Sequence, residues 1–259
     1  MGKRSSNKLN VTAVILFLLS GCAPTERSSD AKLSVGKPAG FSVQHFGAMR
    51  EVMREGKTEA RIRLSDTVAT PHAYAVGALE GLAGEVTIVD GDVWVSRVAE
   101  DGELQVTGPT PLAEDSATLL TLGHVADWHR TAIERSVSGA DLESLIERFA
   151  KTKGVDTDKP FPFRIEGQLT DIELHVINGY CPIATDPAGE SKKPWRQINS
   201  EPVSANIIGF YAPNAVAVMT HHGTSVHAHG IVTVDGRKLI GHVDSVTVEP
   251  GATLFVPKL

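Results

Sequence analysis

The chain has few cysteines, few basic residues and little that is apolar enough for a membrane. Its 259 residues include only two cysteines, Cys22 and Cys181, which excludes a disulfide-stapled scaffold and a cysteine-rich zinc module. Only one run, Val11–Leu19, is apolar enough to contact a membrane, and its nine residues are too few to span one. The 25 basic residues are outnumbered by 31 acidic ones, which argues against a nucleic-acid partner because polyanions need a basic face.

What remains is an ordinary globular composition with one unusual feature. Hydrophobic residues make up 41% of the chain and charged residues 22%, so the chain can bury a sizeable core. Ten histidines are present, and five of them fall within residues 221–242. This clustering is the first indication of function.

The amino terminus is typical of a targeting segment. A basic start is followed by the apolar run Val11–Leu19 and then by Leu-Ser-Gly-Cys22, which resembles a bacterial lipobox. We therefore expect residues 1–21 to be a lipoprotein signal peptide and Cys22 to be lipidated. Residues 22–40 are polar and rich in turn formers, which predicts a flexible tether. The expected location is the extracytoplasmic face of a bacterial membrane, and Ala23 favours the outer membrane if the cell is Gram-negative.

Residues 41–259 are expected to form one α+β domain, mostly an antiparallel, barrel-like β-sheet with few helices. Two β-prone runs flank Asp90-Gly91, a dipeptide that favours tight hairpin turns, and Asp235-Gly236 marks a second hairpin. The other strands are expected at 117–122, 161–165, 171–177, 204–211, 225–234 and 238–248, with a turn at Gly167 and a long loop over 180–201.

Two helices are expected. The clearer one begins after Ser138, which is placed to cap it, and Asp141 takes the acidic position of a capping box. Its apolar residues recur at helical spacing, and Gly154 follows its end. A shorter helix is expected over residues 46–55.

The histidine cluster predicts a metal site on adjacent strands. His227 and His229 are two residues apart on an expected strand, so their side chains share one face, about 6–7 Å apart at Cα. His242 is on the next strand, across the hairpin turn. Three imidazoles with open coordination positions are typical of a catalytic zinc site. Of the adjacent pair His221-His222, at most one can join, and a solvated loop is the favoured interpretation.

Two further residues are candidates with open alternatives. Glu85 begins a strand after Gly84, where it is either a carboxylate for proton transfer near the metal or a surface acid. His175 is in an apolar strand, where it is either a functional group or a half-buried sheet histidine.

Several separate stretches, taken together, resemble the α-acetolactate decarboxylase family. They follow the family order from about residue 43 to the carboxyl terminus: Gly77–Glu85, Phe163–Gly167, Ile207–Phe210, His227–His229 and Gly241–Val243. The resemblance implies a zinc enzyme that removes CO₂ from acetolactate, or a close 2-hydroxy-3-oxo acid, to give acetoin. It implies that His227, His229 and His242 hold the zinc and that Glu85 manages protons.

The sequence also departs from that family. His175 is at the position of an arginine that reaches the substrate carboxylate, and Ala78 is at the position of a threonine. We expect His175 to replace the arginine in part as the partner of the carboxylate. A histidine lacks the two-pronged grip of a guanidinium.

Two alternatives stay open from the sequence. One is a non-catalytic, membrane-anchored lipoprotein of the same fold that binds metal or ligand. The other is a cupin-like metal protein, suggested by His-x-His and by residues 249–257, although the glutamate that usually follows His-x-His in cupins is missing. The expected partners are a small-molecule acid and, through the lipid anchor only, a membrane; a homodimer is left open.

Overall fold

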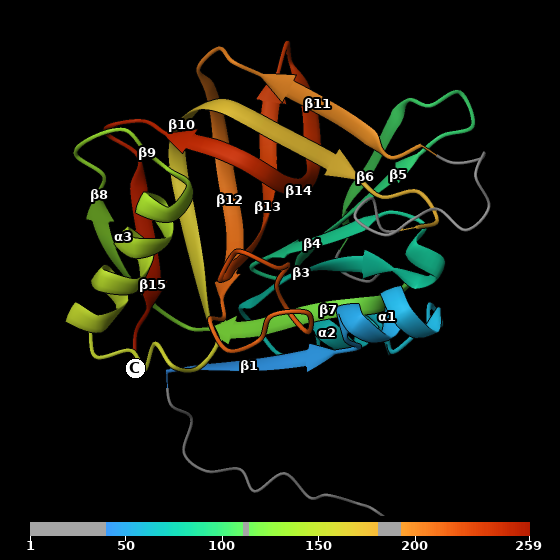
Figure 1. The fold of residues 1–259 in the computed structure, drawn as a ribbon, viewed down its shortest axis with the longest axis horizontal. Coiled ribbons are helices and arrows are strands. Elements are labelled where there is room, and N and C mark those ends of the chain that lie inside the picture. The colour runs from blue at the N-terminus through green and yellow to red at the C-terminus, as the bar shows by residue number, and fades with distance from the viewer. Residues whose placement is uncertain (1–39, 111–113, 181–192) are drawn as a thin grey trace, which may run out of the picture. The chain divides into compact units, whose positions relative to one another are not determined.

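The computed structural model describes residues 40–110, 114–180 and 193–259 (Figure 1). They fall within one of two units of the chain, Lys37–Leu259; the other, Met1–Gly36, lies outside the described residues, as do Cys22 and Cys181. The predicted boundaries at residues 21 and 40 therefore stay predictions. None of the helices in the described part is long and apolar enough to cross a membrane. The helices are α1 (Met49–Glu55), α2 (Leu64–Thr67), the short 3₁₀ helix η1 (Glu80–Leu82) and α3 (Gly139–Thr152).

The first of two sheets is antiparallel throughout. Its strand order is β1-β7-β3-β4-β5-β6, and β2 pairs with β7. Its strands are β1 (Phe41–Phe46), β2 (Ile62–Arg63), β3 (Ala73–Leu79), β4 (Glu85–Val89), β5 (Asp92–Val98), β6 (Leu104–Thr110) and β7 (Ser116–Val125).

The second sheet is also antiparallel, and part of it closes on itself. Its strand order is β8-β15-β10-β12-β13-β14-β9, with β11 paired to β10. An additional pairing between β10 and β14 closes β10, β12, β13 and β14 into a four-stranded barrel. The mostly antiparallel, barrel-like fold expected from the sequence is thus confirmed. The strands are β8 (Trp128–Ala132), β9 (Val137–Ser138), β10 (Phe161–Val176), β11 (Trp195–Asn199), β12 (Val203–Tyr211), β13 (Val226–Val234), β14 (Arg237–Val248) and β15 (Thr253–Pro257).

Both predicted Asp-Gly hairpins are present. Asp90 and Gly91 connect β4 to β5 with φ of 51° and 89°, and Asp235 and Gly236 connect β13 to β14 with φ of 48° and 76°. Two successive positive φ values match the twist of the flanking strands, and Asp and Gly tolerate them better than most residues. The second hairpin fixes the register that pairs His229 with His242.

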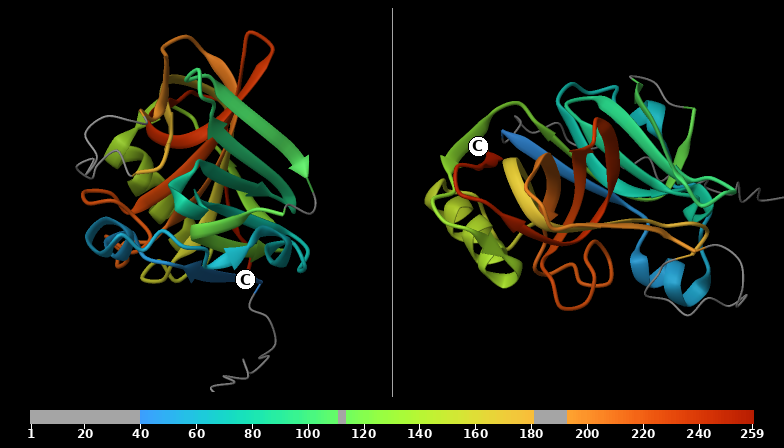
Figure 2. Two further views of the ribbon diagram at one scale, coloured as in Figure 1. Left: turned by 90° about the vertical axis from the view of Figure 1, so that its right-hand side faces the viewer. Right: turned by 90° about the horizontal axis from the view of Figure 1, so that it is seen from above.

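The two sheets pack against each other through apolar side chains. Tyr74 and Val76 of β3 meet Ile208 and Phe210 of β12, and all four are buried. Seen from above, α1, the β12–β13 connection and α3 lie on one side of the sheets (Figure 2). Backbone bonds from Met49 N–H to Val218 O (3.2 Å) and from Arg50 N–H to Ala217 O (2.8 Å) join α1 to that connection.

The predicted turn at Gly167 is wrong, because one continuous strand, β10, runs through it. Gly167 has φ of 149°, and a Cβ there would lie 2.6 Å from Ala252. The glycine therefore marks a close approach between β10 and the turn before β15, not a reversal of the chain. The strand bends instead near Asp171, where φ is 47° and the pairing with β14 shifts register.

Three other sequence predictions need correction. Ser138 is at the N-cap position of α3 as expected, but its side chain makes no capping hydrogen bond. Helix α1 begins at Met49, because Phe46 still pairs with Leu120 in the sheet. Within the expected loop 180–201, Trp195–Asn199 pairs with β10 as a strand, and residues 181–192 lie outside the described part.

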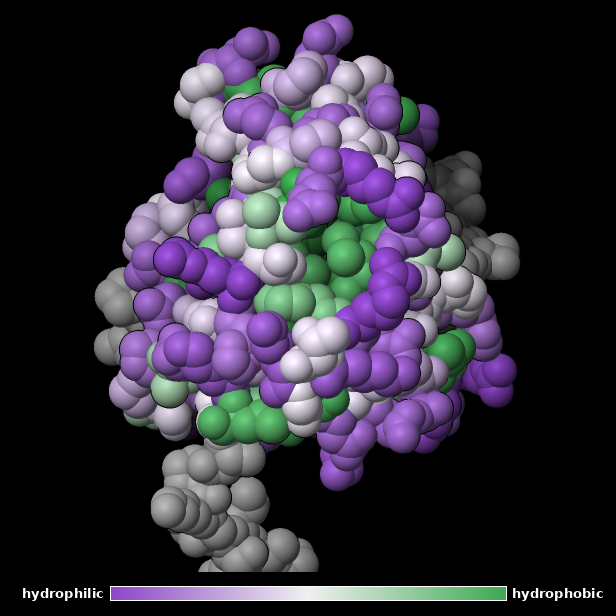
Figure 3. Space-filling view, turned by 90° about the vertical axis from the view of Figure 1, so that its left-hand side faces the viewer, coloured by the Kyte–Doolittle hydropathy of each residue, from purple (hydrophilic) through white to green (hydrophobic). Residues whose placement is uncertain are grey.

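A hollow on the side of the molecule that carries α3 has a hydrophobic floor and a hydrophilic rim (Figure 3). On this side, a cavity between α3 and the β8–β9 segment is lined by Ile133, Val137, Leu145, Phe149, Arg135 and Arg148 among others.

Candidate active site and metal centre

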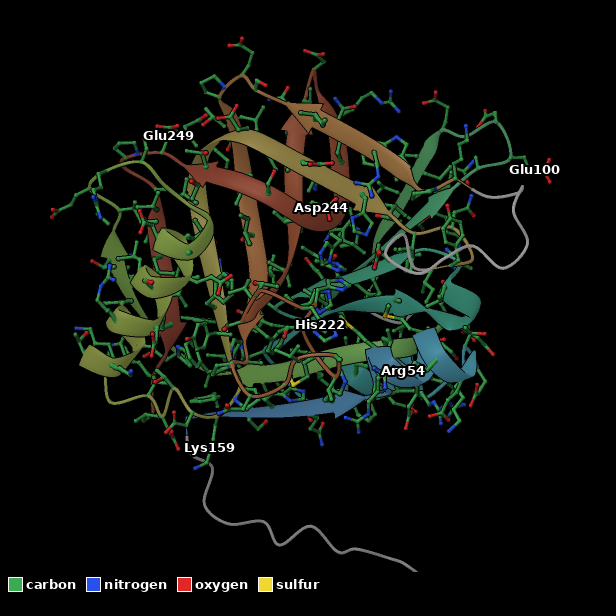
Figure 4. All side chains as sticks on the ribbon, in the orientation of Figure 1. Arg54, Glu100, Lys159, His222, Asp244 and Glu249 are labelled. Atoms are coloured by element: carbon green, nitrogen blue, oxygen red, sulfur yellow. The ribbon has the colours of Figure 1, made fainter. Side chains whose placement is uncertain are left out.

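Three buried histidines meet on β13 and β14. His227 and His229 project from the same face of β13, and His242 pairs with His229 across the hairpin. One ring nitrogen from each lies within 4.8 Å of the others, and the ring centroids are 5.0–5.7 Å apart. Figure 4 shows a cluster of nitrogen-bearing side chains between the labelled Asp244 and His222. The structure therefore brings together the three histidines that the sequence singled out.

The environment of these rings suits a metal ion. Burial, and after it the charge of neighbouring imidazoles, lowers the pKa of all three rings, that of His227 to about 3, so the rings are neutral. Within the described part of the chain, His227 Nδ1 and His229 Nε2 are buried without a hydrogen-bond partner. Orphaned, neutral imidazole nitrogens that converge are the donor set of a zinc-type site.

The other sheet orients one of the three histidines. Thr87 Oγ1 on β4 lies 2.9 Å from His229 Nδ1, across the interface between the sheets. That hydrogen bond fixes the ring plane and leaves Nε2 to face the cluster. Sequence reasoning missed Thr87, although alternation places it on the same face of β4 as Glu85.

Glu85 is buried beside the cluster, not at the surface. It is 5% exposed, its Oε2 lies 3.7 Å from His229 Nε2, and its Oε1 accepts a bond from Ile177 N–H at 3.4 Å. Burial raises the pKa of Glu85 well above its ordinary range, the charge of Asp244 adds to this, and the bond from Ile177 opposes it. Gly84, just before it, permits a close approach to the backbone of β5, since a Cβ there would lie 2.1 Å from Ser96 O. The carboxyl can thus hold a proton inside the site.

His175 is buried, which excludes the half-buried interpretation. It is 5% exposed, and its ring centroid lies 4.7 Å from that of His242. Its Nδ1 is 2.8 Å from Asp244 Oδ2, and Arg196 Nη1 donates to the same oxygen at 3.1 Å. Neither Asp244 nor Arg196 was expected at the site from the sequence. Alternation on β14 could have found Asp244, because it is two residues after His242.

His221 also faces the site. Its ring centroid is 5.3 Å from that of His242 and 6.3 Å from that of His227, whereas His222 is exposed. One member of the pair thus borders the cluster, and the expected solvated loop describes only the other.

A cavity opens onto these groups. Its polar lining is Glu85, His175, His221, His227 and His242, and the rest is apolar. Helix α1, η1 and strands β3 and β7 provide the apolar walls through Met49, Val52, Met53, Ala78, Leu82 and Leu119. An apolar pocket with a few convergent polar groups is the usual form of a small-molecule site.

Comparisons with known proteins agree on one family. The family model for alpha-acetolactate decarboxylase matches residues 49–256. The alpha-acetolactate decarboxylase of Bacillus subtilis strain 168 is 17% identical, with 84% of this chain and 86% of that chain covered and a TM-score of 0.60. A Staphylococcus aureus protein of unknown function, described as similar to alpha-acetolactate decarboxylase, is 14% identical, with coverage of 84% and 85% and a TM-score of 0.57.

At these identities the solved structures show the fold alone. No curated protein matches the sequence significantly. The family match decides against the cupin-like alternative.

Proposed function

The chain belongs to the alpha-acetolactate decarboxylase family, and from this premise we propose that it is a metal-dependent carboxy-lyase. Its substrate would be acetolactate or a close 2-hydroxy-3-oxo acid, and its product acetoin or the matching hydroxyketone. The observation that carries the proposal is the convergence of three neutral, buried histidines and a buried carboxyl at the floor of an apolar cavity.

Zinc is the metal we propose, held by His227, His229 and His242. Imidazole ligands with positions left open suit catalytic zinc, although imidazole also accepts neighbouring transition metals. When bound, zinc would supply Lewis-acid chemistry at the oxygens of the substrate.

Glu85 is the proposed proton carrier. Decarboxylation breaks the bond between the carboxylate carbon and C2, CO₂ leaves, and its bonding electron pair stays on the carbon skeleton. The skeleton must then gain one proton to give the hydroxyketone. A buried carboxyl with a raised pKa gives up its proton less readily than an exposed one, and this carboxyl lies within reach of the histidine cluster.

His175 is the proposed partner of the substrate carboxylate. It lines the cavity, and Asp244 fixes its ring from behind. The walls formed by Met49, Val52 and Leu119 would contact the alkyl groups of the substrate and exclude water from the site.

The test is turnover by the purified, zinc-loaded protein. We expect CO₂ release and hydroxyketone formation from racemic acetolactate, and no activity from a zinc-free sample. If neither acetolactate nor its ethyl homologue releases CO₂, the second candidate holds: a non-catalytic metal- or ligand-binding protein of this fold. That candidate is favoured by His175 and Ala78, which replace the arginine and threonine of the family pattern.

We also propose that Cys22 is lipidated and anchors the protein at the extracytoplasmic face of a bacterial membrane. The support is the sequence alone: a basic start, a short apolar run and Leu-Ser-Gly-Cys. We also propose that the protein assembles as a homodimer, which sedimentation of the purified protein would test.

A further inference from the structure

Asp244 joins three strands at one carboxylate oxygen. Its Oδ2 accepts from His175 Nδ1 at 2.8 Å and from Arg196 Nη1 at 3.1 Å. Asp244 is on β14, His175 on β10, and Arg196 on β11, directly opposite His175 in the register. Arg196 Nη1 is also held by Glu173 Oε1 at 3.1 Å. The chain of contacts runs from a half-exposed guanidinium to a buried imidazole in the wall of the cavity.

Some of these groups resemble a second metal site, but the positive charge of Arg196 beside Asp244 argues against a metal cation there. One ligand atom from each of His175, His242 and Asp244 lies within 4.8 Å of the others. The carboxylate of Asp244, however, already accepts from the guanidinium of Arg196 through Oδ2. Two cations that compete for one oxygen repel each other strongly at this distance. The carboxylate is therefore better explained as a hydrogen-bond acceptor for His175.

That hydrogen bond decides which atom of His175 a ligand meets. The side chain of His175 is only 6% exposed, and Asp244 engages Nδ1, so Nε2 is the ring nitrogen left for a ligand in the cavity. A carboxylate behind a histidine fixes both its tautomer and its ring orientation. With Nδ1 engaged by Asp244, Nε2 is the one ring nitrogen of His175 that can donate an N–H to an anion in the cavity.

We propose that Asp244 is a positioning residue that aims Nε2 of His175 at the carboxylate of the substrate, and that Arg196 holds Asp244 in place. The proposal rests on the proposed function, in which His175 meets that carboxylate. In this proposal, Arg196, Asp244 and His175, which lie on three strands, together take over the contact with the substrate carboxylate that the family arginine would make. We call this set of residues the relay.

The test compares two unreactive probes on the zinc-loaded protein by calorimetry. The probes are 2,3-dihydroxy-2-methylbutanoate, which carries a carboxylate, and butane-2,3-diol, which does not. We expect Asp244→Asn to weaken binding of the acid at least tenfold, because the amide neither bears the charge nor fixes the ring as firmly. Binding of the diol should change less than twofold, and the zinc content should be unchanged. Equal weakening of both probes would show a general structural defect and overturn the proposal.

A matched control and a double-mutant cycle separate positioning from packing. Glu201→Gln changes an exposed carboxylate outside this set of contacts, so it should alter acid binding less than twofold. In a His175→Ala background, Asp244→Asn should cause no further loss, because Asp244 acts through that ring. Additive losses in the double variant would contradict the proposal.

A third readout needs neither ligand nor turnover. In ¹⁵N-histidine spectra of the zinc-loaded protein, assigned with His175→Gln, Nδ1 of His175 should bear a proton in the wild type and lose it in part in Asp244→Ala. If the spectra and the acid probe behave as expected but no CO₂ is released, the decarboxylase proposal fails and the positioning role stands. If CO₂ is released while neither readout depends on Asp244, the positioning role fails and the decarboxylase proposal stands. If the wild type binds neither probe, the ¹⁵N spectra decide.

Discussion

At the residue scale, the proposed zinc site depends on the ring nitrogens of three buried histidines. Replacing His227, His229 or His242 by Ala should lower the zinc content from about one ion per chain to well under half, because two imidazoles rarely hold zinc against dilution. Elemental analysis by mass spectrometry measures this. His222→Ala, at an exposed position in the neighbouring loop, is the control and should keep its zinc, and His221→Ala should change it little. Full retention in a His227→Ala, His229→Ala double variant would show that the metal is held elsewhere.

A variant at Glu85 distinguishes a role in proton transfer from a role in metal binding. Glu85→Gln keeps the size of the side chain but removes the acid, so kcat should fall by about 10²–10⁴-fold while zinc is retained. The control is Glu80→Gln, an exposed acid in the turn just before it. Steady-state CO₂ release together with metal analysis measures both effects. A Glu85→Gln variant as active as the wild type would remove the carboxyl from the mechanism.

At the element scale, Gly167 lets the turn before β15 come close to β10. Gly167→Ala would place a Cβ 2.6 Å from Ala252, which predicts a loss of about 1–3 kcal/mol in unfolding free energy by urea titration. Gly236→Ala is the control, since Gly236 also has positive φ but a Cβ there meets nothing within 4 Å. Equal losses at both sites would mean that backbone conformation, not the clash, sets the cost.

At the scale of the whole molecule, the buried histidines tie stability to pH in the metal-free protein. Their folded-state pKa values are lowered, that of His227 to about 3, against about 6.5 in an unfolded chain. Between these values the unfolded chain binds more protons, so unfolding free energy falls as pH falls. The raised pKa of Glu85 acts in the opposite direction, but it is one group against three.

Urea unfolding at pH 7 and pH 5 should therefore show a loss of more than about 1 kcal/mol on acidification. His227→Asn, which cannot take up that proton, should lose less than the wild type over the same interval. His222→Asn, at the exposed neighbour, should lose as much as the wild type. A loss that is the same in all three proteins would assign it to other groups.

The attachment of the molecule to a membrane is a separate prediction. Cys22→Ser should leave an unprocessed precursor without lipid, whereas the mature wild type should begin at an acylated Cys22. Intact-mass spectra of protein isolated from a bacterial host distinguish the two. A mature wild type that begins at another residue and carries no lipid would refute the anchor.

Local patterns determined much of this fold by themselves. Alternation and Asp-Gly turns gave β4–β5 and β13–β14, because strand faces and tight turns depend on neighbouring residues. The histidine cluster followed from the same rule, since an i, i+2 pair and a hairpin partner must meet on one face. The turn predicted at Gly167 was wrong, because a glycine that permits a close approach between strands looks the same in the sequence as one that forms a turn.

Only the tertiary structure decided what surrounds the three clustered histidines. Thr87 meets His229 from 142 residues away, and Glu85 is buried by the other sheet, which no local period records. His175, Asp244 and Arg196 come together because β10 pairs with both β11 and β14, and sequence spacing does not encode those pairings. The ligand residues depend on neighbours along the chain, whereas their protonation and orientation depend on packing between sheets. For that physical reason the histidine cluster was predictable from the sequence, whereas the contacts of His175 with Asp244, and of Asp244 with Arg196, were not.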